Sequence, residues 1–289
     1  MDDTLRKLQL MELQILKDIA DVCEKHHLRY FLAYGTLLGA VRHQGFIPWD
    51  DDIDLLMPRK DYIKFHEAIQ KEMGEKYTIE STITKEDYYS FSARLRLNGT
   101  TYPEEPLEYV DTHTGIFVDI MPLDDLKTDK GLMLHLRGHV AFWMSALRAI
   151  AHGTKFSQEK FRTLGKMLHP FSLLFYGELS RRIFEDLSMS KSQAGGGYMA
   201  NLASFGNWKK SLVSKDVYGE GVKLQFEDAT FWAPKDYDTV LRKSYGDYMC
   251  LPPLEQQVSA HHTADVNFGK YTTFVEECLQ KDGKKVISI

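Results

Sequence analysis

The chain has 289 residues, 43% of them hydrophobic and 27% charged, which is ordinary for a globular protein with one large domain or two small ones. With a net charge of −5, the chain lacks the overall positive charge that favours nucleic-acid binding. Without an 18-residue apolar run we expect no membrane span. The three widely spaced cysteines fit neither a disulfide framework nor a zinc motif, and the acidic, amphipathic N-terminus is unlike a secretory signal, so we expect a cytoplasmic protein with reduced thiols.

Hydrophobic periodicity predicts the first elements. Apolar residues at helical spacing predict an amphipathic helix over residues 4–26. The elements expected next are a strand rich in aromatic residues at 30–34, a short helix at 37–41 and a loop at 45–49.

An acidic segment follows, in which four of the five residues 50–54 are aspartates. Carboxylates crowded in this way repel one another unless a cation lies among them. If residues 52–56 form a strand, Asp52 and Asp54 point to the same face while Ile53 faces a core. Two adjacent carboxylates suit Mg²⁺, which binds through oxygen ligands and substrate phosphates. The alternative is a solvated acidic turn before a helix.

The rest of the chain is predicted to contain both strands and helices. Asn98-Gly99 predicts a hairpin turn, and three glycines at 195–197 predict a break. The predicted elements are a helix at 59–73, strands at 77–82, 90–97 and 115–121, a helical region at 128–190, a strand or loop at 226–234, a helix at 235–248 and a peripheral C-terminal tail.

Asp119 is the second strong signal because it is the single acid in the hydrophobic run 116–121. Burying it without compensation would be costly. We therefore expect its strand to lie beside the acidic strand, so that its carboxylate joins Asp52 and Asp54. Three carboxylates can hold one or two divalent ions, Mg²⁺ or alternatively Mn²⁺, around a nucleotide diphosphate. The alternative is a buried aspartate that caps the loop at 122–125.

Gly35 and Thr36 form a candidate phosphate site. A glycine between a strand and a helix lets backbone N–H groups approach phosphate oxygens closely. Thr36 would add a hydroxyl donor, unless it is simply an N-cap. Gly-Thr, an Asp-x-Asp motif that begins sixteen residues after Thr36, and an acid in a hydrophobic strand together form the pattern of the nucleotidyltransferase fold.

The chain also resembles one family with this fold, the LicD family. That family includes bacterial phosphocholine transferases that act on cell-surface glycans, and eukaryotic fukutin and fukutin-related proteins carry a related domain. The resemblance spans roughly residues 10–125 and 220–262. The segments that resemble the family signature are YGTLLGAVRH (34–43), GFIPWDDDID (45–54), GIFVDIMPLD (115–124) and YGDYM (245–249) with LPP (251–253).

The resemblance implies transfer of a phosphoryl-alcohol group from a CDP-activated donor to a sugar hydroxyl. In the best-known members the donor is CDP-choline, the leaving group is CMP, and the acceptor is a sugar of a teichoic acid or lipopolysaccharide precursor. The alternatives are another CDP-alcohol, such as CDP-ribitol or CDP-glycerol, and a nucleotidyl transfer that releases diphosphate. A third alternative, a scaffold protein without activity, would be expected to lack one of the three acids.

These expectations assign roles to the residues of the site. Asp52 and Asp54 are expected to anchor Mg²⁺, with Asp50 as a further candidate ligand. Asp119 is expected to complete the site and to take the proton of the acceptor hydroxyl. Arg42 is expected to neutralise developing charge through its fork of donors, or alternatively to be an exposed cation at a helix end.

Three further residues are candidate contacts for the donor. His43 lies within the signature. Trp49 would stack on the base or hold a quaternary ammonium, unless it packs in the core. Arg94 would reach the diphosphate, unless its strand face is solvated. The tandem histidines His261 and His262 are expected at the surface.

We therefore predict an α/β protein with a nucleotidyltransferase-like mixed sheet, an N-terminal helix packed on it and a helical insertion. The expected parts are a catalytic core at 1–127, the insertion at 128–195 and a C-terminal part at 196–289 that completes the core. The insertion is expected to face either the core or the inner face of the cell membrane, where it would meet a glycan or lipid-linked oligosaccharide acceptor. The apolar residues behind this choice are Phe142, Trp143, Met144, Leu147 and Ile150.

Overall fold

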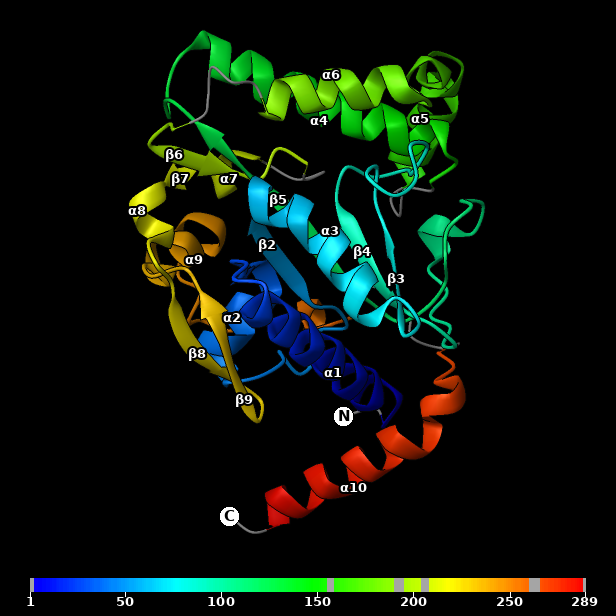
Figure 1. Cartoon of the computed structure of the whole chain (residues 1–289), viewed down its shortest axis with the longest axis vertical. Helices are drawn as coiled ribbons and strands as arrows, with labels where there is room; N and C mark the ends of the chain where they lie inside the picture. Colours follow the sequence, from blue (N-terminus) through cyan, green and yellow to red (C-terminus); the bar gives the residue numbers. More distant parts are fainter. Residues whose placement is uncertain (1–2, 155–158, 190–194, 204–207, 260–265, 288–289) are drawn as a thin grey trace.

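The computed structural model describes residues 3–154, 159–189, 195–203, 208–259 and 266–287. A mixed sheet lies at its centre, with strand order β1-β2-β5-β4-β3 and with β6 and β7 continuing from the far part of β5 (Figure 1). Strands β2 and β5 are parallel, so the predicted α/β fold with a mixed sheet is confirmed. The strands are β1 Phe31–Leu32, β2 Asp54–Pro58, β3 Tyr77–Glu80, β4 Ala93–Leu97, β5 Phe117–Leu126, β6 Tyr198–Ala200, β7 Val213–Ser214, β8 Val222–Phe226 and β9 Ala229–Ala233.

Helices cover the sheet and extend the molecule at both ends. Helices α1 and α3 pack against the sheet, α4, α5 and α6 gather at one end, and α10 lies at the other (Figure 1). The helices are α1 Asp3–Lys25, α2 Tyr34–His43, α3 Arg59–Met73, α4 Leu132–Ala151, α5 Glu159–Ser172, α6 Glu178–Met189, α7 Trp208–Ser211, α8 Lys215–Tyr218, α9 Tyr237–Tyr245 and α10 Thr272–Ile287. Short 3₁₀ turns lie at Glu105–Leu107, Leu173–Phe175, Leu254–Gln256 and Gly269–Tyr271.

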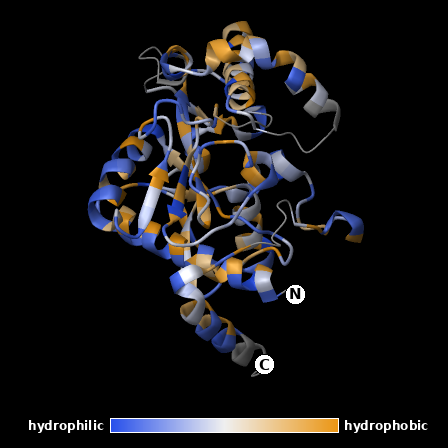
Figure 2. Ribbon diagram, turned by 90° about the vertical axis from the view of Figure 1, so that its right-hand side faces the viewer, coloured by the Kyte–Doolittle hydropathy of each residue, from blue (hydrophilic) through white to orange (hydrophobic). Residues whose placement is uncertain are grey.

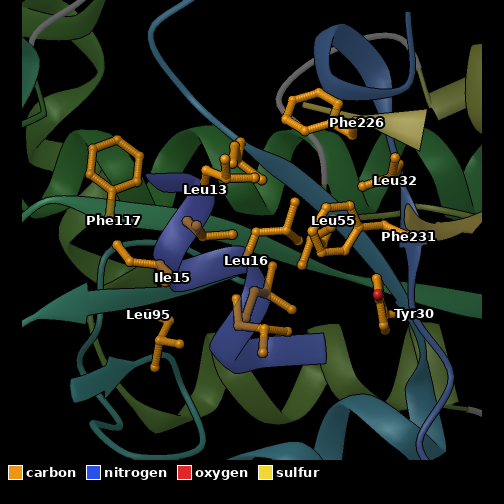
Figure 3. Close-up of a cluster of buried hydrophobic side chains, with 14 of the residues drawn as sticks. Leu13, Ile15, Leu16, Tyr30, Leu32, Leu55, Leu95, Phe117, Phe226 and Phe231 are labelled. Carbon is orange, nitrogen blue, oxygen red and sulfur yellow. The ribbon is translucent and has the colours of Figure 1, made fainter. Parts of the chain in front are cut away.

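The main hydrophobic core lies between α1, the sheet and the hairpin β8–β9. The apolar face of α1 is fully buried, which confirms the helix predicted at 4–26. Each fully buried Leu or Ile contributes about 1.5–3 kcal/mol, so this face fixes α1 firmly on the sheet. Figure 3 shows the labelled core residues Leu13, Ile15, Leu16, Tyr30, Leu32, Leu55, Leu95, Phe117, Phe226 and Phe231.

The strand predicted at 30–34 is shorter than expected. Strand β1 ends at Leu32, Ala33 is the extended N-cap, and α2 begins at Tyr34 with a positive φ of 43°. Gly35 and Thr36 therefore lie in the first turn of a helix. A left-handed conformation at a tyrosine costs about 1–3 kcal/mol, and such strain often occurs at functional sites.

Several other predictions need correction. The Asn98-Gly99 turn is present, with a φ of 81° at Gly99, but the chain then makes a long excursion before it returns as β5. Strand β5 continues past 121 to Leu126 because Pro122 still pairs with Met57 of β2. The segment predicted as a strand or loop at 226–234 contains β9, which forms a hairpin with β8, because the polar pair at 227–228 reverses the chain.

The predicted helical region at 128–190 is confirmed as α4, α5 and α6. Met144 and Ile150 are buried, so that face of α4 packs inward, whereas Trp143 is 50% exposed. The buried guanidinium of Arg148 donates to the carbonyl oxygens of Tyr88 and Glu86 and so fastens α4 to the main body. Whether the three predicted parts fold as separate units stays a prediction. Across the described ranges, no helix is long and apolar enough to cross a membrane.

Candidate functional site

The register of three neighbouring strands brings the predicted acids together. The parallel pairing of β2 with β5 sets Asp54 opposite Asp119, and the antiparallel pairing of β4 with β5 sets Arg94 opposite the same residue. Asp52 lies two residues before β2, so the acidic strand starts later than predicted. Nevertheless, Asp52, Asp54 and Asp119 each offer a carboxylate oxygen within 4.8 Å of the others.

A second group of acids shares Asp52. Carboxylate oxygens of Asp50, Asp51 and Asp52 also lie within 4.8 Å of one another. Asp51 is fully buried and accepts hydrogen bonds from the hydroxyls of Tyr102, at 3.2 Å, and Ser259. The acidic segment is therefore held in the structure by its own contacts, which excludes the alternative of a merely solvated turn.

Gly35 allows the acidic segment to approach α2. A Cβ atom at this position would lie 2.7 Å from Oδ2 of Asp50, which is too close for a side chain. The carboxylate of Asp50 therefore lies against the first turn of α2, where the helix dipole favours negative charge. The role of Gly35 in binding donor phosphates stays a prediction.

Thr36 connects the same turn to the strand that carries the acids. Its Oγ1 accepts a hydrogen bond from the backbone N–H of Asp54 at 2.8 Å, and its side chain is buried. Ala33 is the N-cap of α2, so the N-cap alternative for Thr36 is wrong. A contact between Thr36 and a donor phosphate stays a prediction.

The electrostatics of the cluster favour a bound cation. Burial and the carboxylates of Asp52, Asp119 and Asp50 raise the pKa of Asp54 well above its usual range, while Arg94 opposes the shift. A divalent ion would offset this repulsion, and Mg²⁺ and Mn²⁺ prefer such oxygen ligands. The side chains present therefore fit a divalent metal.

Arg94 is a neighbour of the cluster rather than a solvated side chain. Its Nε lies 2.8 Å from Oδ1 of Asp119, and its Nη1 lies 2.5 Å from Oε1 of Glu104. The guanidinium also lies 4.1 Å from the ring centroid of Phe117. Burial lowers the pKa of Arg94, but Asp119 and Glu104 outweigh it and raise that pKa well above its ordinary value. Glu104 could not be predicted from the sequence, because this contact depends on a loop that returns to β4.

Arg42 lies at the other end of α2 from Gly35. Its Nη1 donates to the carbonyl oxygen of Tyr248 at 2.9 Å, and its Nε contacts Nε2 of His43 at 2.9 Å. Burial lowers the pKa of Arg42, which is partly buried in the last turn of α2, so the alternative of a helix-end cation stays open. Its side chain contacts a ring nitrogen and carbonyl oxygens, and a role in charge neutralisation stays a prediction.

The remaining candidates are Trp49, His43 and the tandem histidines. Trp49 is partly buried, packs against the main core and meets the ring of His43 at 6.4 Å, edge to face. Packing is therefore at least part of its role, while donor contacts by Trp49 and His43 stay predictions. His261 and His262 lie outside the described residues.

Two residues near the cluster were missed. Tyr245, the last residue of α9, is 45% exposed, and burial together with the carboxylates of Asp54 and Asp50 raises its pKa. Tyr245 begins the signature segment YGDYM, and that membership could have indicated a role for it. The other is Glu12 of α1, whose surroundings are described below.

Cavity size does not locate this site. A cavity of about 490 Å³ lies between α1 and the hairpin β8–β9, where Trp232 and Lys17 are among its lining residues. It contains none of the predicted acids. The chemistry of the carboxylates therefore identifies the candidate site.

Comparison with known proteins agrees with this location. Residues 27–136 match the LicD/FKTN/FKRP nucleotidyltransferase domain, a range that includes all the clustered aspartates. The chain is 30% identical over 273 residues to the lipopolysaccharide cholinephosphotransferase LicD of Haemophilus influenzae, which covers 90% of this chain and 96% of that protein. Shorter matches are an uncharacterized protein of Rickettsia typhi, 43% identical over 21% of this chain and 20% of that protein, and mannosyltransferase regulator 4 of Saccharomyces cerevisiae, 29% identical over 32% of this chain and 8% of that protein.

Proposed function

This chain belongs to the LicD family of transferases, and on that basis we propose that it transfers phosphocholine from CDP-choline to a sugar hydroxyl of a cell-surface glycan precursor. The precursor would be of the lipopolysaccharide or teichoic acid type, and CMP would be released. One combined observation carries the proposal. The similarity covers 96% of a lipopolysaccharide cholinephosphotransferase, and three acids gather within the matched domain.

The acidic cluster would hold the metal. Asp52, Asp54 and Asp119, with Asp50 as a further ligand, would bind Mg²⁺ or Mn²⁺ as one ion or two. When bound, the metal would neutralise charge on the donor diphosphate and on the phosphoryl group in transfer. The paired contact with Arg94 would orient Asp119 as a ligand.

The reaction is a substitution at the phosphorus that bears choline. The oxygen of the acceptor hydroxyl forms a new bond to that phosphorus, the P–O bond to CMP breaks, and its electron pair leaves with CMP. In our proposal the hydroxyl proton passes to Asp119. Gly35 and Thr36 would position the donor phosphates at the start of α2, and Arg42 would neutralise developing charge.

Aromatic and basic side chains would hold the rest of the donor. A quaternary ammonium is attracted to the faces of aromatic rings. Tyr245, half exposed and close to the acids, would provide such a ring, and Trp49 with His43 would provide a second contact. Arg94, which pairs with Asp119, would reach the diphosphate beside the acidic cluster.

The insertion would bring the acceptor to the site. Its helices expose many large apolar side chains, and Figure 2 shows hydrophobic segments beside hydrophilic ones at this end of the molecule. Residues 128–189 contain nine Lys and Arg against five Asp and Glu, although the whole chain has a net charge of −5. The exposed apolar residues are Leu132, Met133, Leu136, Val140, Trp143, Leu164, Met167, Phe171, Leu173, Leu174, Tyr176, Leu179 and Ile183.

This combination suits an anionic membrane surface that carries a lipid-linked oligosaccharide. We propose that the enzyme acts in the cytoplasm, at the inner face of the cell membrane. Vesicle cosedimentation tests this part of the proposal. The variant L136A/W143A should bind anionic vesicles less than wild type does, whereas I63A, an exposed apolar change on α3, should bind equally. Absence of wild-type binding to anionic vesicles would contradict the membrane contact.

The decisive test of function is product analysis. The enzyme is incubated with Mg²⁺ and CDP-choline, CDP-ribitol or CDP-glycerol, with and without extracted glycan, and CMP and diphosphate are measured. We expect glycan-dependent CMP release with CDP-choline and none with Asp54→Asn. If the enzyme prefers CDP-ribitol or CDP-glycerol, the transferred group is a polyol phosphate and not phosphocholine. If diphosphate is released, the reaction is nucleotidyl transfer.

A further inference from the structure

Helix α1 carries two buried acids with different surroundings. Asp18 accepts hydrogen bonds from Tyr77 Oη at 2.6 Å and from Gln14 at 2.9 Å, and it pairs with Lys76. Glu12 is 0% exposed, and within the described ranges neither of its carboxyl oxygens has a hydrogen-bond partner. Two acids on one helix are thus buried, and only Asp18 is compensated.

The side of α1 that carries Glu12 lies against the acidic segment. One turn earlier, Gln9 donates from Nε2 to the carbonyl oxygen of Asp50 at 2.8 Å. The charged groups that act most strongly on Glu12 are the carboxylates of Asp52, Asp51 and Asp50, in that order. Glu12 therefore lies on the side of α1 that meets the acidic segment, at a position where the helix otherwise presents apolar side chains to the core.

A buried carboxylate without a partner costs several kcal/mol, and nearby carboxylates add to that cost. A hydrated divalent ion would remove both penalties, because it supplies positive charge and O–H donors together. Asp50, Asp51 and Asp52 already offer oxygens within 4.8 Å of one another, a group to which Glu12 does not belong. This geometry suits a contact through metal-bound water rather than direct ligation.

We propose that Glu12 is a positioning residue of the metal site, which accepts hydrogen bonds from water bound to a divalent ion held by Asp50, Asp51 and Asp52. This ion would lie beside one held by Asp52, Asp54 and Asp119, since Asp52 belongs to both groups. It would link α1 to the catalytic strands. The inference rests on the proposed function, because it takes the acidic site to bind Mg²⁺ or Mn²⁺.

Direct titration with Mn²⁺ tests the role of Glu12 without any turnover. Free Mn²⁺ is followed by electron paramagnetic resonance with wild type, Glu12→Gln and Asp18→Asn, all as full-length chains. We expect Glu12→Gln to weaken Mn²⁺ binding roughly tenfold or more, as loss of an outer-shell partner does. Asp18→Asn should lower the melting temperature but keep the wild-type affinity. Wild-type affinity and stoichiometry in Glu12→Gln would overturn the inference.

Metal-free stability gives a second readout. In a chelating buffer, Glu12→Gln and Glu12→Leu should melt at or above the temperature of wild type, since an uncompensated carboxyl group has been removed. Mn²⁺ should then raise their melting temperature less than that of wild type. An equal rise in both variants would overturn the proposal. If wild type binds Mn²⁺ through Glu12 but releases no CMP from CDP-choline, the proposed donor fails while this inference stands.

Discussion

Strand β5 carries acids near both of its ends, and their surroundings differ. At the C-terminal end, Asp124 is fully buried and meets Arg59 in a two-point contact, with Nε–Oδ1 at 2.7 Å and Nη2–Oδ2 at 2.9 Å. At the N-terminal end, Asp119 has Arg94, but Asp54 beside it is surrounded mainly by other carboxylates. An aspartate of this sheet therefore stabilises the fold where an arginine pairs with it. Where the aspartates outnumber the arginines, they retain the capacity to bind a metal.

The largest expected effect comes from neutralising an acid at the crowded end. Asp54→Asn should lower transfer by about 10³-fold or more, because loss of a metal ligand removes several kcal/mol of charge stabilisation. The melting temperature without metal should equal or exceed that of wild type at neutral pH, since the lost charge was repelled by its neighbours. Steady-state CMP release and thermal melting measure the two effects. A fully active Asp54→Asn enzyme would contradict the assignment of this residue, and Asp52→Asn should behave in the same way.

At the C-terminal end of β5, a substitution should lower stability and leave activity nearly unchanged. Arg59→Ala leaves Asp124 buried without its cation, which should lower the free energy of unfolding by about 3–5 kcal/mol. Transfer per folded molecule should remain close to wild type below the melting transition. Urea unfolding and activity at low temperature separate these effects. The double variant Arg59→Met with Asp124→Leu is the matched control and should recover much of the stability, whereas a loss of activity in both variants would break the comparison.

Arg94 pairs with an aspartate, as Arg59 does, but that aspartate belongs to the acidic cluster. Arg94→Gln should lower kcat about 10–100-fold, because Asp119 loses the side chain that orients it. Mn²⁺ should bind about as tightly as in wild type, because the lost orientation of Asp119 is offset by removal of a competing positive charge. An unchanged kcat would show that Arg94 does not position Asp119. Arg94→Lys keeps the charge without the two-point contact and should give an intermediate kcat.

The sequence was informative where the pattern is local. The hydrophobic run around Asp119 and the alternation after Asp54 are properties of short segments, so the strands and their neighbouring relation could be predicted. The contact of Arg94 with Glu104 could not, because it depends on the register of β4 against β5 and on the path of a long loop. The start of β2 at Asp54 rather than at 52 likewise follows from pairing with β1 and β5.

Glu12 is a different case, because its signal was present. It lies four residues from both Leu8 and Leu16, on the face of α1 that forms the core. An acid at such a position is the helical counterpart of Asp119 in its hydrophobic strand. Periodicity identified the helix, but only the fold shows that this face meets the acidic segment.

The smallest expected effect is a pH dependence of stability in the absence of metal. The pKa of Asp54 is raised in the folded protein, mainly by burial and then by neighbouring carboxylates. A raised pKa means that protonation favours the folded state, so this stabilisation is present at low pH and is lost as the pH rises through the folded pKa. Metal-free wild type should therefore become less stable as the pH rises from the ordinary carboxyl range towards the raised pKa of Asp54, the opposite of a protein dominated by paired carboxylates.

Mn²⁺ should reverse this trend, because its ligands bind as carboxylates and its affinity grows as they lose protons. Urea unfolding across the pH range, with chelator and with Mn²⁺, measures both curves. Asp54→Asn should flatten the metal-free curve, since it removes a titrating group whose charge is opposed by its surroundings. If this variant follows the wild-type curve, the repulsion does not arise at Asp54. The metal-free pH dependence would then have to arise at Glu12. The pKa of Glu12 is also raised by burial and by the same aspartates.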